Sequence, residues 1–233
     1  MYDSMYNFFK TNKLINKNQS GFIPGDSTIN QLLSITTEIY EAFERYDEVR
    51  AVFLDMSKAF DKVWHEGLIF KLKQNGINGN LLNLLENYLS NRKQRVVLNG
   101  IQSDWNPILS GVPQGSILGP ILFLIFINDL TDNIHSSIKL YADDCSLFAR
   151  VGNIETTHGQ LMADLDTITK WANLWKMKFN PDISKQAIEV IFSAKYKKPD
   201  HPPLFSITYP WQGNHPQNIL ALPLTRDSHL ENI

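Results

Sequence analysis

The sequence contains a single cysteine, Cys145, among its 233 residues. One cysteine excludes a disulfide framework and a zinc site built from several thiolates. The six histidines are scattered along the chain and lack the i, i+4 spacing that places two imidazoles on one helix face. The sequence therefore has neither the pattern of a disulfide-stabilised domain nor that of a zinc site.

Long apolar segments and a strong charge imbalance are also missing. The most apolar window, residues 117–127, is too short to span a bilayer and is interrupted by Gly119 and Pro120. No signal peptide opens the chain, so we expect a nuclear or cytoplasmic protein that is not secreted and has no membrane partner. The formal net charge of −2 does not indicate a polyanionic partner. Lysines and arginines nevertheless gather at 10–17, 92–95 and 195–198, where they can hold phosphates.

The composition is that of a folded globular protein, with 43% hydrophobic and 20% charged residues. The almost continuous apolar run 49–54 predicts a buried strand. Helical spacing of apolar residues predicts helices over about 27–45, 65–74, 80–89, 117–130 and 161–175. Shorter strands are expected at 92–98 and 101–109, joined by an Asn-Gly turn, and at 187–192.

The most informative stretch is Tyr141-Ala142-Asp143-Asp144. Short apolar runs on both sides predict a tight hairpin whose turn carries Asp143 and Asp144. Adjacent carboxylates repel each other, so a fold that keeps both usually offsets their charge with a cation. Hard oxygen ligands favour magnesium or a similar ion. An ordinary acidic turn is the alternative, because Asp is common in turns.

Two other segments could contribute to such a site. Asp55 stands at the end of the predicted strand 49–54, where a carboxylate can meet a ligand, although a helix N-cap explains it equally well. The loop 110–116 carries two glycines, a proline and Gln114 before an apolar helix. Such a helix entry lets the backbone approach an anion closely. Simple turn formation is the competing explanation for the loop.

Together these segments indicate phosphoryl transfer. Acidic positions at two predicted strand ends, far apart in sequence, could converge on a pair of metal ions, which is the known arrangement for in-line displacement at phosphorus. Nucleotidyl transfer is therefore the leading chemistry. The residues alone leave a polymerase and a nuclease as equal alternatives.

Three blocks of sequence carry a family resemblance. They are FLDMSKAFDKVWHEGLIFKL (53–72), GVPQGSILGPILFLIFINDL (111–130) and YADD (141–144). Their order and spacing resemble the reverse transcriptases of non-LTR retrotransposons, the jockey-like LINE group, over roughly residues 1–195. The Ala-Asp-Asp form also differs from the Gly-Asp-Asp that is usual in viral RNA replicases.

The resemblance implies an α+β fold: a polymerase palm, an antiparallel sheet backed by helices, with partial fingers. It implies that Asp55 and Asp143 ligate two Mg²⁺ ions, for which Mn²⁺ could substitute. Asp144 would be the second acid of the pair, and the Met56 carbonyl would be a further ligand. The implied activity is RNA-directed DNA synthesis, with an RNA template, a DNA primer and dNTPs as partners.

The resemblance also assigns residues that would contact the nucleotide. Phe60 matches the position of an aromatic steric gate that crowds a ribose 2′-hydroxyl, with a plain core role as the alternative. Gln114 and Gly115 would line the nucleotide and template pocket. Lys185 would assist the pyrophosphate leaving group, but four residues rather than the family's two separate it from Asn180.

Departures from the family keep two functions open. The segments that flank the palm in relatives are not found, so we expect partial fingers at 1–48, a palm with inserted fingers elements at 49–195, and an irregular or disordered tail at 196–233. A frameshift is one hypothesis for the loss of apolar periodicity in that tail. The chain is then either an RNA-directed DNA polymerase domain or a catalytically silent relic that binds nucleic acid weakly. A bare metal-dependent nuclease is a weaker third option.

Overall fold

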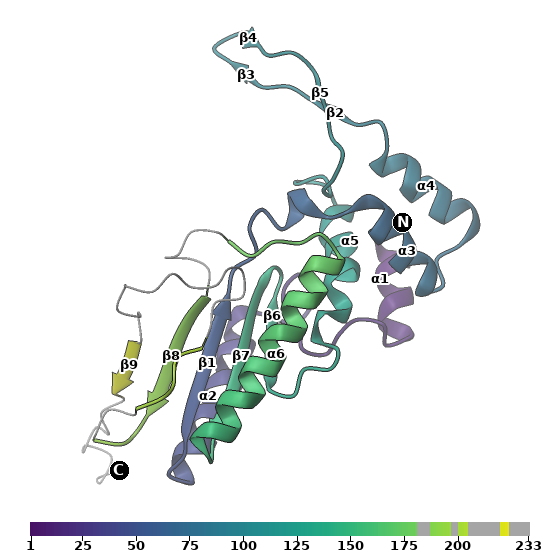
Figure 1. Cartoon of the computed structure of the whole chain (residues 1–233). Helices are drawn as coiled ribbons and strands as arrows, with labels where there is room; N and C mark the ends of the chain where they lie inside the picture. The colour runs from purple at the N-terminus through teal and green to yellow at the C-terminus, as the bar shows by residue number, and fades with distance from the viewer. Residues whose placement is uncertain (181–186, 197–199, 205–219, 224–233) are drawn as a thin grey trace, which may run out of the picture. The chain divides into compact units, whose positions relative to one another are not determined.

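A five-stranded sheet forms the centre of one of two structural units. The computed structural model describes residues 1–180, 187–196, 200–204 and 220–223 (Figure 1). Unit 1 combines residues 1–17, 57–130 and 171–178, and unit 2 combines residues 18–56, 131–170 and 179–233. Both units are thus assembled from separate stretches of chain. The ranges 1–48, 49–195 and 196–233 drawn from the sequence stay predictions.

The sheet of unit 2 has the strand order β6-β7-β1-β8-β9. Its strands are β6 (Ser137–Tyr141), β7 (Asp144–Val151), β1 (Glu48–Leu54), β8 (Ala187–Ser193) and β9 (Leu220–Pro223). All neighbours pair antiparallel except β8 and β9, which run parallel. The expected antiparallel sheet is confirmed, and β9 adds a strand in a region where the sequence shows no periodicity.

Helices lie on both faces of this sheet. Figure 1 shows α6 (Ile154–Leu174) in front of the sheet and α2 (Thr28–Glu44) behind it. Val49 and Ala51 of β1 form a buried cluster with Phe148 of β7 and with Ile39 and Ala42 of α2. The face of β1 that meets α2 is therefore apolar, as the run 49–54 predicts.

Only part of the predicted apolar face of α2 is buried. The helix begins where the sequence places it, because the Ser27 hydroxyl accepts a hydrogen bond from the Asn30 amide. Ile29, Leu32 and Leu33 belong to the apolar face that helical spacing predicts for 27–45 and that is expected to pack in the core, but they are 59–67% exposed. The C-terminal half of α2 carries the contacts with β1 and β7 instead, so the spacing predicted the helix correctly but overstated its buried length.

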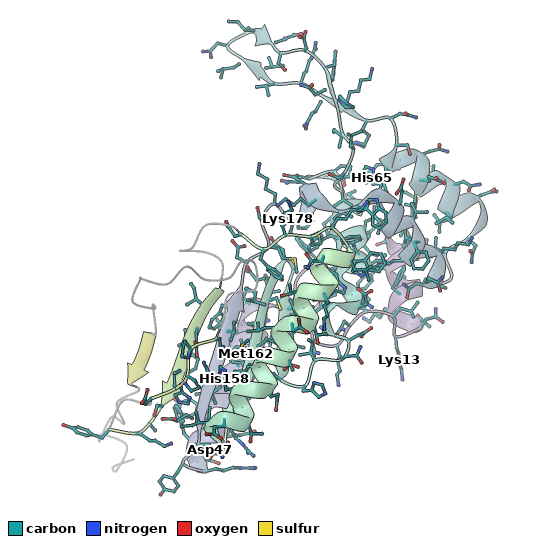
Figure 2. The ribbon with its side chains drawn as sticks, in the orientation of Figure 1. Lys13, Asp47, His65, His158, Met162 and Lys178 are labelled. Atoms are coloured by element: carbon teal, nitrogen blue, oxygen red, sulfur yellow. The ribbon has the colours of Figure 1, made fainter. Side chains whose placement is uncertain are left out.

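A buried polar network lies on the other side of β1. The Arg50 side chain is 1% exposed and forms an ion pair with Glu189 of β8. Its guanidinium also donates to the Pro202 carbonyl oxygen at 2.5 Å. A guanidinium nitrogen lies 3.3 Å from Nδ1 of His158 on α6. His158 is labelled in Figure 2. A charged group buried so deeply requires such partners. Arg50 consequently ties together β1, β8, α6 and residue 202.

Unit 1 is mainly helical. It contains α1 (Tyr2–Thr11), α3 (His65–Gln74), α4 (Gly79–Leu89) and α5 (Leu118–Ile127), with short 3-10 turns at Phe60–Lys62 and Asn128–Thr131. Nearly every residue of α5 is buried, which explains its uniformly apolar sequence. A ribbon follows α4, formed by β2 (Lys93–Gln94) with β5 (Asn106–Pro107) and by β3 (Val97–Leu98) with β4 (Ile101–Gln102).

Lys71 of α3 is a buried cation inside unit 1. Its ammonium donates to Asp129 and to the Phe126 carbonyl oxygen, each at 2.5 Å. It also lies 3.7 Å from the ring centroid of Trp175 and 5.0 Å from that of Trp171. Aromatic faces and a carboxylate together compensate for the lost hydration of the ammonium. This cation therefore joins α3 and α5 to the segment around Trp171 and Trp175.

The helices of the described residues include none with the length and apolar character needed to cross a membrane.

Candidate active site

The turn that carries the acidic pair is a two-residue connection between β6 and β7. Tyr141 pairs with Asp144 across the hairpin, so Ala142 and Asp143 form its tip. Ala142 has φ of 55°, the left-handed conformation that tight hairpin turns require. Asp143 is half-buried and Asp144 is exposed. The hairpin predicted from the sequence forms, but only Asp143 lies in its turn; Asp144, expected there too, is the first residue of β7 and pairs with Tyr141.

Gln19 holds this turn from an adjacent loop of unit 2. Its buried side-chain carbonyl accepts hydrogen bonds from the amides of Ala142 (2.9 Å) and Gly21 (2.7 Å). Its amide donates to the Ala142 carbonyl oxygen at 3.2 Å. The Ser20 amide also donates to the Leu140 carbonyl oxygen at 3.0 Å, which continues the pairing along β6. Gln19 thus fixes the backbone immediately before Asp143.

Asp55 follows β1 directly and is brought to the same end of the sheet as the turn. The last β1–β7 pair is Leu54 with Cys145, so Asp55 lies one step further along, beside Asp144. The Asn180 side chain donates to Oδ2 of Asp55, and its backbone amide donates to the Asp55 carbonyl oxygen, each at 2.9 Å. No helix begins at Asp55, because the next helical turn starts at Phe60. The N-cap alternative is therefore wrong.

Burial and neighbouring negative charge act on both Asp143 and Asp144. Burial raises the pKa of Asp143 above its ordinary value; a backbone hydrogen bond opposes this, and the negative charge of Asp55 adds to the increase. Burial is also the largest cause of the raised pKa of Asp144, and the negative charges of Asp143 and Asp55 raise it further. A nearby negative charge disfavours the ionised form of a carboxyl group. A bound cation would relieve this repulsion.

The donor chemistry of the cluster fits a hard divalent ion. Its side chains supply only carboxylate oxygens, which are the ligands that Mg²⁺ and Mn²⁺ prefer. In the described stretches, however, no three His, Cys, Asp or Glu side chains are arranged closely enough to hold a metal. Magnesium also takes water and substrate oxygens as ligands, so a partial protein set suffices. Met56, proposed to add a carbonyl, is buried and bridged to Phe179.

Cys145 follows Asp144 directly but is not a candidate metal ligand. Its side chain is fully buried, and burial together with the charge of Asp144 raises the pKa of the thiol to about 12.

Phe60, Gln114 and Gly115, expected to contact the nucleotide, belong to unit 1, whereas the carboxylates belong to unit 2. Phe60 is half-buried and stacks on Phe123 with ring centroids 4.3 Å apart. Gln114 is exposed, and its amide donates to Oδ1 of Asp61 at 2.8 Å. Gly115 has φ of 76° and open space around it. Lys185 lies outside the described residues.

The loop 110–116 packs against the segment that carries Phe60. The amides of Gly111 and Val112 donate to the carbonyl oxygens of Val63 and Phe60, each at 2.8 Å. A Cβ at Gly111 would lie 2.8–3.0 Å from backbone atoms of Asp61, and φ there is 94°. Glycine is required at this position for both reasons. The loop therefore has a defined packing role in addition to forming a turn.

Sequence reasoning missed Gln19 and Gly21 and treated Asn180 only as the start of a lysine motif. Isolated polar residues in loops carry no periodicity, and their partners are distant in sequence: Gln19 pairs with residue 142, and Asn180 pairs with residue 55. The Gly21-Phe22-Ile23-Pro24-Gly25 stretch indicated a loop but gave no sign of what it packs against.

Comparison with known proteins decides the family. Residues 2–204 match the family described as "Reverse transcriptase (RNA-dependent DNA polymerase)". The chain belongs to the reverse transcriptase family. Members of this family use divalent metal ions, in keeping with the carboxylate cluster. The resemblance to non-LTR reverse transcriptases is confirmed by the relatives.

Two relatives come from Drosophila melanogaster mobile elements. The RNA-directed DNA polymerase from mobile element jockey is 33% identical over 178 residues, 73% of this chain and 19% of the relative. The probable RNA-directed DNA polymerase from transposon BS is 32% identical over 200 residues, 82% of this chain and 22% of the relative. This reverse transcriptase chain thus spans about a fifth of the length of these curated relatives.

Solved structures support the fold. Apo telomerase from Candida tropicalis, truncated from its C-terminal domain, aligns with a TM-score of 0.59 over 82% of this chain and 39% of that chain. A complex of the same enzyme with a fragment of telomeric RNA aligns equally well over 81% of this chain and 33% of that chain. Identities are 11% and 12%, so the likeness concerns the fold. The expected α+β polymerase palm is confirmed.

Proposed function

We propose that this chain is an RNA-directed DNA polymerase domain that transfers nucleotides from dNTPs to a primer 3′-hydroxyl on an RNA template. One observation carries the proposal. Asp55 at the end of β1 lies at the same end of the sheet as Asp143 and Asp144 of the β6–β7 hairpin, where burial and then the negative charge of Asp55 raise the pKa of both Asp143 and Asp144.

The carboxylates would hold two Mg²⁺ ions, with Asp55 and Asp143 as ligands to both, Asp144 as the second acid of the pair and the Met56 carbonyl as a further ligand. Such a metal pair stabilises the attacking and leaving oxygens of an in-line displacement. Asn180 orients Asp55 through its side-chain hydrogen bond. Gln19 fixes the backbone that presents Asp143. These two amides would keep the acids in place as charge develops on the reacting phosphate.

The remaining proposed contacts concern the incoming nucleotide. Phe60 would exclude a ribose 2′-hydroxyl, and its stacking on Phe123 would keep the ring in one orientation. Gln114 and Gly115 would line the nucleotide and template pocket, where the exposed loop leaves space for a ligand. Lys185 would assist departure of pyrophosphate.

Asp143→Asn is expected to abolish polymerisation. The substitution preserves shape but removes a negative charge, so Mg²⁺-dependent dNTP incorporation on an RNA template with a DNA primer should fall by at least about 10²–10³-fold. The measurement is primer extension with purified full chain. Asp47→Asn is the matched control, because Asp47 precedes β1 at its opposite end (Figure 2). Full activity in the Asp143 variant, or none in a folded unmodified chain, contradicts the proposal; the second outcome would favour the relic.

Phe60→Val is expected to relax sugar selection. A smaller side chain leaves room for the 2′-hydroxyl, so preference for dNTPs over rNTPs should fall by roughly 10–200-fold, the range that a few carbon atoms contribute to specificity. Competing incorporation of matched dNTP and rNTP measures it. Phe70→Val serves as control, since Phe70 is exposed on α3. Unchanged sugar preference in the Phe60 variant would leave Phe60 as a core residue only.

A further inference from the structure

The ribbon formed by β2, β3, β4 and β5 extends from unit 1 beyond its helices (Figure 1). Every residue from 93 to 107 is exposed. Lys93 pairs with Pro107 near its base, and Leu98 pairs with Ile101 at its tip, around the Asn99-Gly100 turn. A two-stranded ribbon without a packed face is only marginally stable in water. A ligand that covers the ribbon would therefore stabilise it.

The tip of the ribbon is apolar. Val96, Val97, Leu98 and Ile101 are 56–77% exposed. Single exposed apolar side chains are common, but a contiguous group marks an interaction site. Aliphatic side chains of this kind can lie against the faces of unpaired bases or insert between base steps.

The base of the ribbon is cationic and aromatic. The charged residues of segment 92–109 are Arg92, Lys93, Arg95 and the single acid Asp104. The segment therefore carries two net positive charges, whereas the whole chain has a net charge of −2. The Arg95 guanidinium lies 4.5 Å from the ring centroid of the exposed Trp105. Guanidinium and indole planes are the groups on which bases stack, and nearby cations hold the phosphates.

We infer that the ribbon spanning residues 92–109 is a docking surface for an unpaired RNA strand. Arg92, Lys93 and Arg95 contact phosphates, the Arg95–Trp105 pair supplies a stacking platform, and the apolar tip covers base faces. The local positive charge favours a polyanionic nucleic acid and disfavours pairing with the equally cationic ribbon of a second copy. The choice of RNA rests on the proposed function, since a template strand must be held unpaired before it is copied.

The test is fluorescence anisotropy of labelled oligo(U) RNA with the full chain. A variant combining Arg95→Ala with Trp105→Ala should weaken binding by about 10–100-fold, because it removes one phosphate contact and one stacking surface. Arg95→Ala alone should lower the slope of log affinity against log salt by about 1. Arg45→Ala with Tyr46→Ala is the matched control, an exposed Arg–aromatic pair outside the ribbon that should leave binding unchanged.

A tip variant combining Leu98→Ser with Ile101→Ser distinguishes the alternative occupants. Weaker RNA binding with unchanged hydrodynamic size supports the docking surface. Unchanged RNA binding, conversion of a dimer to a monomer, or ribbon-dependent binding of oligo(dT) but not oligo(U) overturns it. Asp143→Asn should bind RNA normally. Loss of polymerisation and loss of ribbon binding are thus separate results, and either proposal can fail alone.

Discussion

Gly21→Ala is expected to abolish dNTP incorporation while the chain stays folded. A Cβ at residue 21 would lie 2.8 Å from Cα of Ala142 and 2.9 Å from the carbonyl carbon of Tyr141, and closer still to the Ala142 amide nitrogen. These are backbone atoms, which cannot rotate away as a side chain would. The turn must therefore move away from residue 21, and Asp143 moves with it. A displacement of about 1 Å in a catalytic group costs on the order of 10²-fold in rate.

Primer extension and circular dichroism together measure this effect. Gly159→Ala is the control, because a Cβ at this position of α6 meets nothing within 4 Å. That change should preserve activity and stabilise the helix by about 0.5–1 kcal/mol. A Gly21→Ala variant with normal activity would show that the turn tolerates displacement, and that Gln19 does not position Asp143 for catalysis.

Arg50→Met is expected to destabilise the chain by about 3–5 kcal/mol, the usual cost of removing one partner from a buried ion pair. Methionine fills much of the space but leaves Glu189 and the Pro202 carbonyl oxygen without their donor. Urea denaturation followed by far-UV circular dichroism measures the free energy of unfolding. The midpoint should fall without a change in slope, since the surface exposed on unfolding is nearly the same.

Two comparisons isolate the buried charge. Arg150→Met removes a half-exposed arginine of the same sheet, paired with Asp47 at 3.3 Å, and should cost about 0–1 kcal/mol. Adding Glu189→Leu to Arg50→Met should recover part of the lost stability, because no unpaired charge then remains inside. Equal losses in the Arg50 and Arg150 variants would mean that the Arg50 network contributes nothing beyond a surface pair.

The elements that carry the acids could be predicted from sequence because their patterns are local. The run 49–54, the hairpin around Asp143 and the helix 65–74 each depend on residues next to one another, and all three form as expected. Burial was harder to predict, because it depends on neighbours. Helical spacing cannot show that Leu32 and Leu33 lie outside the part of α2 that packs on β1 and β7.

The supporting contacts of the site could not be predicted for the same reason. Gln19 and Asn180 act through hydrogen bonds to residues more than a hundred positions away in the sequence. No pattern within either loop distinguishes these amides from solvated ones. Arg50 is similar: one arginine within an apolar strand indicates neither burial nor its partner on β8. Local periodicity identifies helices and strands, whereas the partners of these three residues depend on how the helices, strands and loops pack together.

The buried thiol beside Asp144 has a practical consequence for studying the ribbon. Thiol-reactive dyes and spin labels attack the thiolate, so a fully buried cysteine with a pKa near 12 is inert to them at neutral pH. It is also the only cysteine of the chain. A cysteine introduced at exposed Leu98 would therefore be labelled alone, with the native sequence otherwise untouched. The distance of the ribbon tip from a labelled RNA end could then be followed in solution.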